Sequence, residues 1–412
     1  MFEKLYKQGA ALDRHSCAPF ADERQRYLAH CAQQGYSHGA LCEIAIALLW
    51  VAHEFSACPE LKATSLQIQV AAGRWTRHQQ RRHRVRNSKV TRSIFSKTST
   101  RWLQFLGNQA EPIREHQPFT ALIDDFAAWM KYERGLSPVT IQNRRWYLDK
   151  FLRWYVAMDR PISEVQITDI DAFLAEYGKR TSRITTATSA AALKAFFKYA
   201  GIRGWCPCSI AEAIQSPRVF AQENVPSGPA WQDVRRLLAS MDTDDSFDIR
   251  DRAIAMLFAI YGLRSSEVSQ LKLEDIDWEH DQISVWRPKQ RRRQTYPLIA
   301  LVGNAVGRYL QEVRPPCSWR EIFLTIKAPL RPTSHLNNVI SQRMLALGIC
   351  TRHRGPHALR HACAAHLIAQ GFTLKEIGDH LGHRSSSSTE IYAKVDLPSL
   401  RKVAEFDLGG LS

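Results

Sequence analysis

Long hydrophobic runs are absent from this 412-residue sequence. The most apolar run, Ile44–Ala52, is only nine residues long and is flanked by Glu43 and His53. A membrane-spanning helix needs about 20 apolar residues, so this run suits a buried helix. The N-terminal sequence also lacks the hydrophobic segment and cleavage site of a signal peptide. Both absences predict a cytoplasmic protein.

Cysteines are few, and their spacing shows no pairing. The sequence has nine, an odd number, without the pattern of a disulfide framework. Cys206 and Cys208 have no second pair nearby, and the histidines and cysteines between His15 and Cys58 lack the paired spacing of a zinc site. We therefore expect reduced thiols and no metal.

Acidic residues are outnumbered by basic ones. The chain has 40 Asp and Glu against 56 Lys and Arg, so its net charge is +16 and its pI is about 9.6. An excess of this size favours a polyanionic partner over an acidic small molecule. An anionic membrane is the competing explanation, but no stretch of the sequence is apolar enough to enter one.

The stretch from Arg74 to Arg101 has ten Lys or Arg and no acidic residue. A charged run is ordinarily a solvated surface. A run of one sign repels itself unless an anion lies against it, and the interspersed Ser, Thr, Asn and Gln suit phosphate contacts. We therefore favour contact with the DNA backbone. The candidate residues are Arg74, Arg77, Arg81, Arg82, Arg84 and Arg86.

The region from Phe119 to Gly201 has the pattern of four amphipathic helices. Gly135 ends the first, and Ser137 with Pro138 forms the N-cap and first position of the second. The basic pair Arg144 and Arg145 on that second helix is a further candidate for DNA contact.

The preceding region repeats the same plan. Its landmarks Gly35, Ser37, Leu41 and Leu48 fall 100 residues before Gly135, Ser137, Ile141 and Leu148. Ser65–Ile68 and Ser99–Gly107 parallel Glu164–Ile167 and Leu193–Gly201. Landmarks matched in one order predict a tandem duplication. Chance similarity between amphipathic helices is the alternative.

Prolines and a Ser-Gly pair without any period mark residues 215–229 as a linker. Helices follow it, and then two alternating strands around a basic turn, DQISVWRPKQRRRQTYPLI. We predict four parts: an additional N-terminal helical domain (1–112), a second helical domain (117–214), the linker (215–229), and a mixed domain with a C-terminal tail (230–412).

Arg264 is the first candidate for chemistry, in the stretch YGLRSSEVSQL. It follows Gly262 where a helix is expected to begin, and a helix N-terminus favours anions. Glu267 stands at the offset of a capping box. An ordinary surface pair of Arg264 and Glu267 is the alternative.

The tip of the basic hairpin carries Lys289. Such a tip is commonly only a solvated turn, but its flexible ammonium can also enter a groove and protonate a leaving oxygen. Arg291, Arg292 and Arg293 stand behind it as candidates for DNA contact.

The stretch HALRHACAAHL places His357 and Arg360 three residues apart on a helix, so both can address one ligand. His357 and His361 have the i, i+4 spacing of a metal pair. No Glu-x-x-His arrangement completes such a site, so we do not expect metal here.

Near the C-terminus, LGHRSSSSTEIY contains His383 and, nine residues later, Tyr392. Nine residues turn a helix by about 900°, so the two side chains cannot share one helix face. The tract Ser385–Ser388 is weakly helical and is expected to form the break between them. Tyr392 is then either a half-buried amphipathic anchor or a mobile nucleophile.

In this order, the candidates resemble the active-site pattern of tyrosine recombinases, the phage integrase family. The matching residues are Arg264, Lys289, His357, Arg360, His383 and Tyr392. The resemblance covers about residues 230–405, and residues 119–215 are similar to the helical core-binding domain of that family. The first hundred residues depart from it, because many relatives begin with one helical DNA-binding domain and this chain has two.

The resemblance implies an α+β fold: SAM-like helical DNA-binding domains, here duplicated, before a mixed α/β catalytic domain with a small antiparallel sheet. It also implies a bacterial cytoplasmic enzyme that needs no cofactor and acts as a tetramer on double-stranded DNA, with sister recombinases or accessory factors as further partners. The tail after Tyr392 has apolar residues at helical spacing, and docks either on its own domain or on a neighbouring protomer.

The implied chemistry is attack on a DNA phosphate to give a 3′-phosphotyrosine, in the integration, excision or transposition of a mobile element. Tyr392 is the nucleophile, Arg264 and Arg360 hold the phosphate oxygens, Lys289 protonates the leaving 5′ oxygen, His357 manages the tyrosine proton, and His383 bonds the phosphate. Two alternatives remain. One is DNA relaxation in the manner of a type IB topoisomerase, and the other is a catalytically silent DNA-binding architectural factor.

Overall fold

A computed structural model describes residues 1–7, 9–56, 63–81, 88–108, 119–219, 228–288, 290–334, 336–383, 385 and 387–392. Its contacts divide the chain into two units: Met1–Ala110 with Asn224–Ser412, and Glu111–Glu223. The first unit contains separate hydrophobic cores before and after the second unit in sequence. Among the described helices, none is long and apolar enough to cross a membrane.

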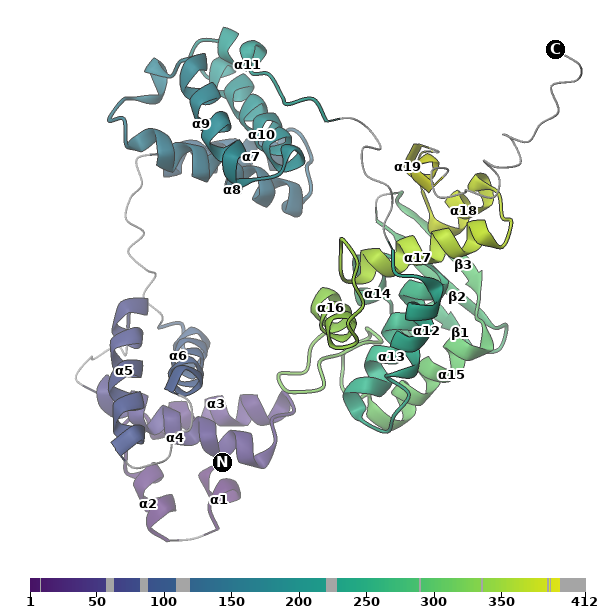
Figure 1. Ribbon diagram of the computed structural model, residues 1–412. Coiled ribbons are helices and arrows are strands. Elements are labelled where there is room, and N and C mark those ends of the chain that lie inside the picture. The colour runs from purple at the N-terminus through teal and green to yellow at the C-terminus, as the bar shows by residue number, and fades with distance from the viewer. Residues whose placement is uncertain are drawn as a thin grey trace, which may run out of the picture. The chain divides into compact units, whose positions relative to one another are not determined.

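The N-terminal helices pack around their own core (Figure 1). They are α1 (Phe2–Leu5), α2 (Ala10–Ser16), α3 (Ala21–Gln33), α4 (His38–Glu54), α5 (Ser65–Arg81) and α6 (Ser88–Phe105). The apolar run in α4 supplies the fully buried Leu48 and Val51, and α6 supplies Phe95 and Trp102. The run is therefore helical, as the sequence predicts, and it is buried on one face, with Ile46 exposed.

The second unit is entirely helical in its described part. It contains α7 (Thr120–Tyr132), α8 (Pro138–Val156), the 3-10 turn η1 (Ile162–Glu164), α9 (Ile167–Arg180), α10 (Arg183–Ile202) and α11 (Ser209–Ala213). Phe126, Phe151, Phe196 and Phe197 meet edge to face in its core. The four main helices are those expected from the sequence.

The two helical bundles share their turn geometry. Gly35 and Gly135 both have positive φ, +84° and +58°, between the first two main helices. Two residues later, Ser37 and Ser137 accept hydrogen bonds from the backbone N–H three residues on, at 3.4 and 3.3 Å. An N-cap serine satisfies a helix N–H that has no partner within the helix. The glycine and serine landmarks thus have the same turn and cap geometry in both bundles, and the tandem duplication itself stays a prediction.

The remaining part of the chain is mixed. Its helices are α12 (Trp231–Ala239), α13 (Ser246–Ile260), α14 (Ser265–Ser269), α15 (Ala300–Arg308), α16 (Leu336–Ala346), α17 (Pro356–Ala369), α18 (Leu374–Leu381) and α19 (Ser387–Glu390), with the short helices η2 (Leu273–Asp275) and η3 (Tyr309–Val313). Strands β1 (Ile276–Asp277), β2 (Gln282–Arg287) and β3 (Arg292–Pro297) form an antiparallel sheet in that order. The predicted hairpin is β2–β3, and β1 is an addition.

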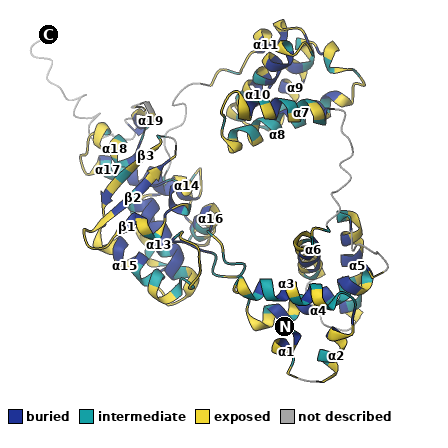
Figure 2. Ribbon diagram, turned by 180° about the vertical axis from the view of Figure 1, so that it is seen from behind, coloured by how far each residue is buried: buried dark blue, intermediate teal, exposed yellow. Residues whose placement is uncertain are grey.

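The core of this mixed part surrounds α13, most of which is buried between Ile249 and Ala259 (Figure 2). The sheet contributes Ile283 and Val285, which alternate with outward residues because successive strand residues face opposite sides. Helix α17 packs on α13 and also contacts α18. These contacts bring together the C-terminal ends of α13 and β2 and the loop after α18, where the candidate residues lie.

Candidate active site

Arg264 caps α14, as the sequence predicts. Its backbone N–H donates to Glu267 Oε2 at 2.7 Å, and its guanidinium Nη1 donates to Glu267 Oε1 at 2.9 Å. The other terminal nitrogen, Nη2, donates to the carbonyl of Gly382 at 3.2 Å. The side chain keeps 28% of its surface exposed, so it is fixed in direction but accessible to a ligand.

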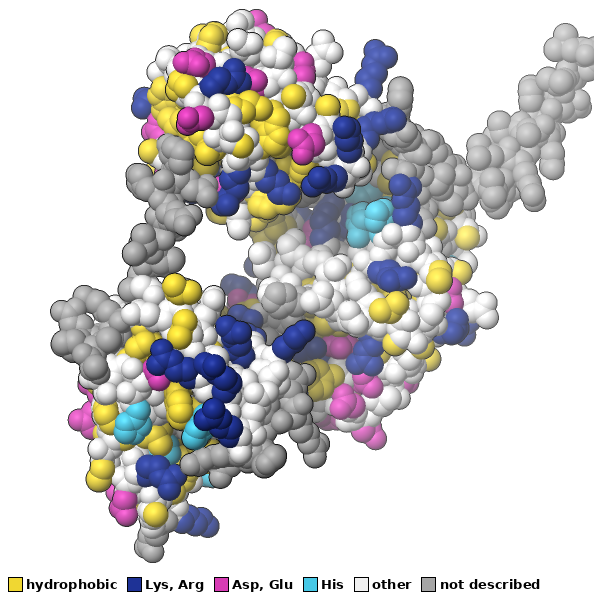
Figure 3. Space-filling view, turned by 60° about the vertical axis from the view of Figure 1, so that its left-hand side comes forward, with side chains coloured by type: hydrophobic (Ala, Val, Ile, Leu, Met, Phe, Trp, Pro, Cys, Tyr) yellow, Lys and Arg dark blue, Asp and Glu magenta, His cyan; other side chains and the backbone are white. Residues whose placement is uncertain are grey.

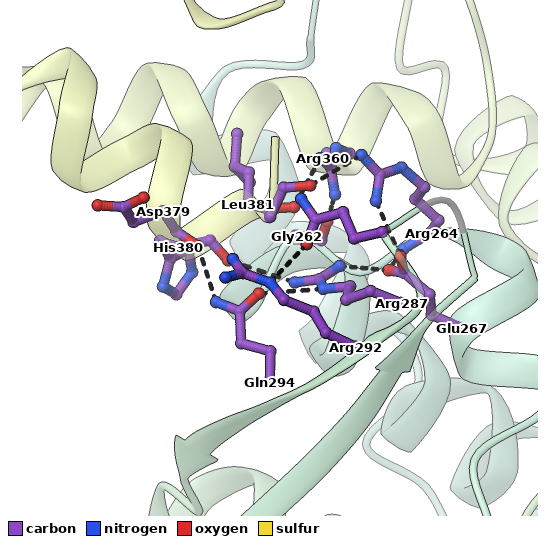
Figure 4. A network of polar contacts seen from close by, with 12 residues as sticks. Gly262, Arg264, Glu267, Arg287, Arg292, Gln294, Arg360, Asp379, His380 and Leu381 are labelled. Carbon is purple, nitrogen blue, oxygen red and sulfur yellow. Dashed lines mark hydrogen bonds and ion pairs between the residues drawn. The ribbon is translucent and has the colours of Figure 1, made fainter. Parts of the chain in front are cut away.

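Arg287, at the end of β2, shares that carboxylate and is fully buried (Figure 4). Its Nη1 lies 2.5 Å from Glu267 Oε2, and its Nη2 donates to the hydroxyl of Tyr296 on β3. The same Nη2 lies 3.4 Å from the carbonyl of His380 on α18. Because a buried charge is costly unless it is paired and hydrogen-bonded, this network fixes three elements to one another.

Arg360 reaches the same place from α17. Its guanidinium donates to the carbonyls of Gly262 and Leu381, the latter at 2.8 Å. Burial lowers its pKa to about 10, and the nearby Arg264 adds to this effect, so the group stays charged at neutral pH. Two cationic side chains from different helices thus converge beside the turn after α18, where an anion would be favoured.

That turn is built on Gly382, which ends α18 with φ +62°. A Cβ there would lie 2.7 Å from Arg287 Nε, so both the backbone conformation and the close approach require glycine. His383 follows, and its Nδ1 lies 2.7 Å from Thr389 Oγ1. Burial lowers the pKa of His383 to about 4, and Arg360 and Arg264 contribute, so its imidazole is neutral at pH 7.

Tyr392 is buried, with 1% of its surface exposed, in a small hydrophobic cluster with Ile377 and Leu381 of α18. Its hydroxyl lies 2.7 Å from Nδ1 of His361 on α17. Burial raises the pKa of Tyr392 to about 12 and lowers that of His361 to about 4. At neutral pH the hydroxyl therefore keeps its proton and shares a hydrogen bond with the neutral imidazole.

The serine tract agrees with the expectation in part. A break separates His383 from Tyr392 and Ser385 lies in it, as we expected, but Ser387 and Ser388 belong to the short helix α19. In α19, Thr389 is buried, bonds His383 and lies against Gly378 of α18. This packing outweighs the weak helix propensity of serine.

Among the other candidates, His357 is exposed at the start of α17, with its ring 4.3 Å from that of His361. Lys289, Arg82, Arg84, Arg86 and the tail after Tyr392 lie outside the described residues. Arg291 and Arg292 are exposed. Three other candidates for DNA contact form ion pairs instead: Arg293 with Asp275 at 2.8 Å, Arg145 with Asp124 at 2.5 Å, and Arg74 with Glu54 at 2.5 Å. The described residues contain no group of three or more metal-ligating side chains.

Sequence reasoning missed two residues of this site. Arg287 was one of several basic residues in a hairpin, and only contact with α14 and α18 reveals its burial. His361 was considered solely as a metal ligand. Its i, i+4 position from His357 was a usable signal, because it places both rings on the face of α17 that meets Tyr392.

The buried histidines predict a pH dependence of stability. The pKa values of His361 and His383 are lowered to about 4 in the folded chain, against about 6.5 when unfolded. The unfolded state then binds more protons, so the unfolding free energy falls as pH drops from about 6.5 towards 4. Urea unfolding at several pH values measures this. His383→Asn is expected to flatten the dependence, and exposed His353→Asn is not; equal slopes in both variants would contradict the assignment.

Comparison with known proteins gives consistent matches. The sequence matches the Phage integrase family over residues 231–397 and the Phage integrase, N-terminal SAM-like domain over residues 123–204. The protein y4rA of Sinorhizobium fredii, named as an integrase/recombinase, is 36% identical over 73% of this chain and 76% of its own length. Tyrosine recombinase XerC of Syntrophus aciditrophicus is 30% identical over 68% of this chain and 95% of its own.

Solved structures share the fold. The Tn1549 transposon integrase in complex with transposon right-end DNA has a TM-score of 0.55 at 18% identity, over 69% of this chain and 98% of that one. The XerH site-specific recombinase bound to its difH substrate has a TM-score of 0.54 at 17% identity, over 83% of this chain and 96% of that one. At such identities the likeness concerns architecture alone.

Proposed function

Because the chain belongs to the phage integrase family of tyrosine recombinases and is a site-specific recombinase, we propose that it cuts DNA through a 3′-phosphotyrosine at Tyr392. The observation that carries this proposal is the convergence of Arg264 and Arg360 beside the Gly382–His383 turn, with Tyr392 in the adjoining cluster. Both arginines are held by backbone carbonyls, so little reorganisation is needed when a phosphate arrives.

In the proposed reaction, the Tyr392 oxygen attacks the phosphorus and the bond to the 5′ oxygen breaks. The tyrosine proton passes to His357, and Lys289 supplies a proton to the leaving oxygen. Arg264 and Arg360 balance the charge that develops on the non-bridging oxygens. Attack by a 5′-hydroxyl from another strand reverses these steps and rejoins the DNA.

Tyr392 must move before it can react. A hydroxyl that is buried and bonded to His361 cannot reach a phosphodiester of duplex DNA, and its pKa of about 12 makes it a weak nucleophile where it lies. His383 is bonded to Thr389, three residues before Tyr392, and we propose that the same movement releases it. We propose that assembly on DNA supplies it, within a tetramer that pairs two duplexes.

We further propose that the domains run as 1–112, 117–214 and 230–412, joined by the linker 215–229, and that the two helical bundles bind DNA. The named relatives and the structures solved with DNA support a DNA partner. The transposon integrase among them supports a role in moving a mobile element. The setting is the bacterial cytoplasm.

Mapping covalent adducts tests this function. Cells that produce the chain are lysed in denaturant, DNA linked to the protein is recovered, and its ends are sequenced. We expect a few recurrent sites, with protein on the 3′ end. Ends scattered without a common sequence would favour relaxation in the manner of a type IB topoisomerase, and the absence of linked DNA would favour a silent DNA-binding factor.

A further inference from the structure

The two helical bundles carry their positive charge on different helices. In the N-terminal bundle, α4 has no Lys or Arg, and it contains Glu43 and Glu54. Its counterpart in the second bundle, α8, contains Arg144, Arg145, Lys150 and Arg153 against one acid, Asp149. The helix that would present a basic face in one copy is therefore acidic in the other.

The third helices differ in the opposite sense. Helix α5 contains Arg74, Arg77 and Arg81 and no acidic residue. Its counterpart α9 contains Asp169, Asp171 and Glu176 against Lys179 and Arg180. The fourth helices, α6 and α10, are both basic and free of acids. The basic face thus consists of α5 and α6 in the first copy, and of α8 and α10 in the second.

The α5–α6 face is open. Arg77, Arg92 and Lys97 are exposed, and neither Arg77 nor Lys97 has an ion-pair partner among the described residues. A groove of about 380 Å³ runs between the helices, and Gly73 leaves room in it. Its lining residues are Gly73, Thr76, Arg77, Ser88, Lys89 and Arg92. Figure 3 shows Lys and Arg side chains gathered on the N-terminal helices, beside hydrophobic ones.

The corresponding groove of the second bundle suits phosphate less well, because its lining has no excess of basic residues. Its lining, between α9 and α10, has one acidic residue, Asp171, and one basic residue, Arg218, and it includes the segment 215–218 that follows α11. A carboxylate there repels phosphate, and the chain itself occupies part of the surface. The two bundles thus differ in the charge of their surface residues, whereas the geometry of their turns and caps agrees.

We propose that the α5–α6 face is a binding site for the phosphate backbone of duplex DNA, and that the two copies hold DNA by different faces. This proposal depends on the proposed function in one respect only, which is that the polyanion bound by the α5–α6 face is DNA. Exposed Leu66 and Val70 also lie on α5, as they would in a protein interface. Two helices with seven Lys or Arg and no acid fit phosphate better, because lysine is depleted in protein interfaces.

The test is the salt dependence of binding by the full chain to duplex DNA of arbitrary sequence. The triple variant Arg77→Gln/Arg92→Gln/Lys97→Gln should reduce the slope of log K against log salt by about 2 to 3, at roughly 0.9 per phosphate contact. When salt rises from 50 to 200 mM, the affinity of the triple variant for DNA should therefore fall about 40-fold less than that of the wild type.

A matched control removes the same charge elsewhere in the N-terminal bundle. Lys4, Lys7 and Arg26 are exposed in the same unit, and their triple change to Gln should alter the slope by less than 1. Arg77→Lys/Arg92→Lys should keep the wild-type slope. Two results would overturn the proposal. One is an equal slope in both triple variants. The other is loss of self-association in the α5–α6 variant with an unchanged slope, which would mean that this face binds protein. At saturating DNA, the triple variant should still form the covalent adduct at Tyr392. Loss of the adduct in the wild type would therefore contradict the proposed function and not the proposed binding face.

Discussion

Tyr392→Phe is expected to abolish the covalent protein–DNA adduct while the chain stays folded. The change removes only the hydroxyl and its hydrogen bond to His361, so the unfolding free energy should fall by no more than about 1.5 kcal/mol. The ring stays in the cluster with Ile377 and Leu381. A nicked duplex carrying a mapped site, followed by a denaturing gel, measures the adduct.

Tyr309→Phe is the matched control. Tyr309 is equally buried in the same part of the chain, and its hydroxyl accepts one hydrogen bond, from the backbone N–H of Leu324. This variant should lose similar stability and keep the adduct. An adduct that persists in Tyr392→Phe, or none in the wild type on a mapped site, would show that another group is the nucleophile.

Arg287→Met is expected to cost about 3 kcal/mol of stability and about 100-fold in the rate of cleavage. Removing one partner of a buried ion pair leaves a buried carboxylate poorly compensated, typically at 3–5 kcal/mol. We expect the lower end because Glu267 keeps both contacts with Arg264. The rate falls because Arg264 and the Gly382 turn lose the side chain that packs beneath them, and displacement by about 1 Å can cost 100-fold.

Two measurements separate these effects. Hydrogen exchange of peptides from α14 and α18 reports the local stability, and single-turnover cleavage at saturating DNA reports the rate. Arg236→Met breaks an exposed pair with Asp233 and should change either by little. Adding Glu267→Gln to Arg287→Met should cost less than the sum of the single changes, because they share one interaction. Additive costs would mean that Glu267 and Arg287 act independently.

Local signals in the sequence predicted much of the fold. Ser37 and Ser137 are N-caps because a serine oxygen can bond a helix N–H three residues on, whatever lies around it. The β2–β3 hairpin followed from alternation around a basic turn. The capping box of Arg264 and Glu267 followed from their spacing.

Contacts between segments that are distant in the sequence could not be predicted from it. Arg287 meets Glu267 twenty residues away and the His380 carbonyl ninety-three residues away, and nothing beside it in sequence marks it as buried. The bond between His361 and Tyr392 has the same origin. Serine propensity correctly predicted a break at Ser385 but not the helix at Ser387 and Ser388, because packing of Thr389 against Gly378 stabilises that helix, whereas propensity describes an isolated chain.

The burial of Tyr392 has a thermal consequence. The side chain contributes to the same hydrophobic cluster as Ile377 and Leu381, so bringing its hydroxyl to a phosphate exposes apolar surface to water. Hydration of apolar surface raises the heat capacity. The activation enthalpy of cleavage should therefore change with temperature, and an Eyring plot of the cleavage rate should curve where opening of the cluster precedes the chemical step.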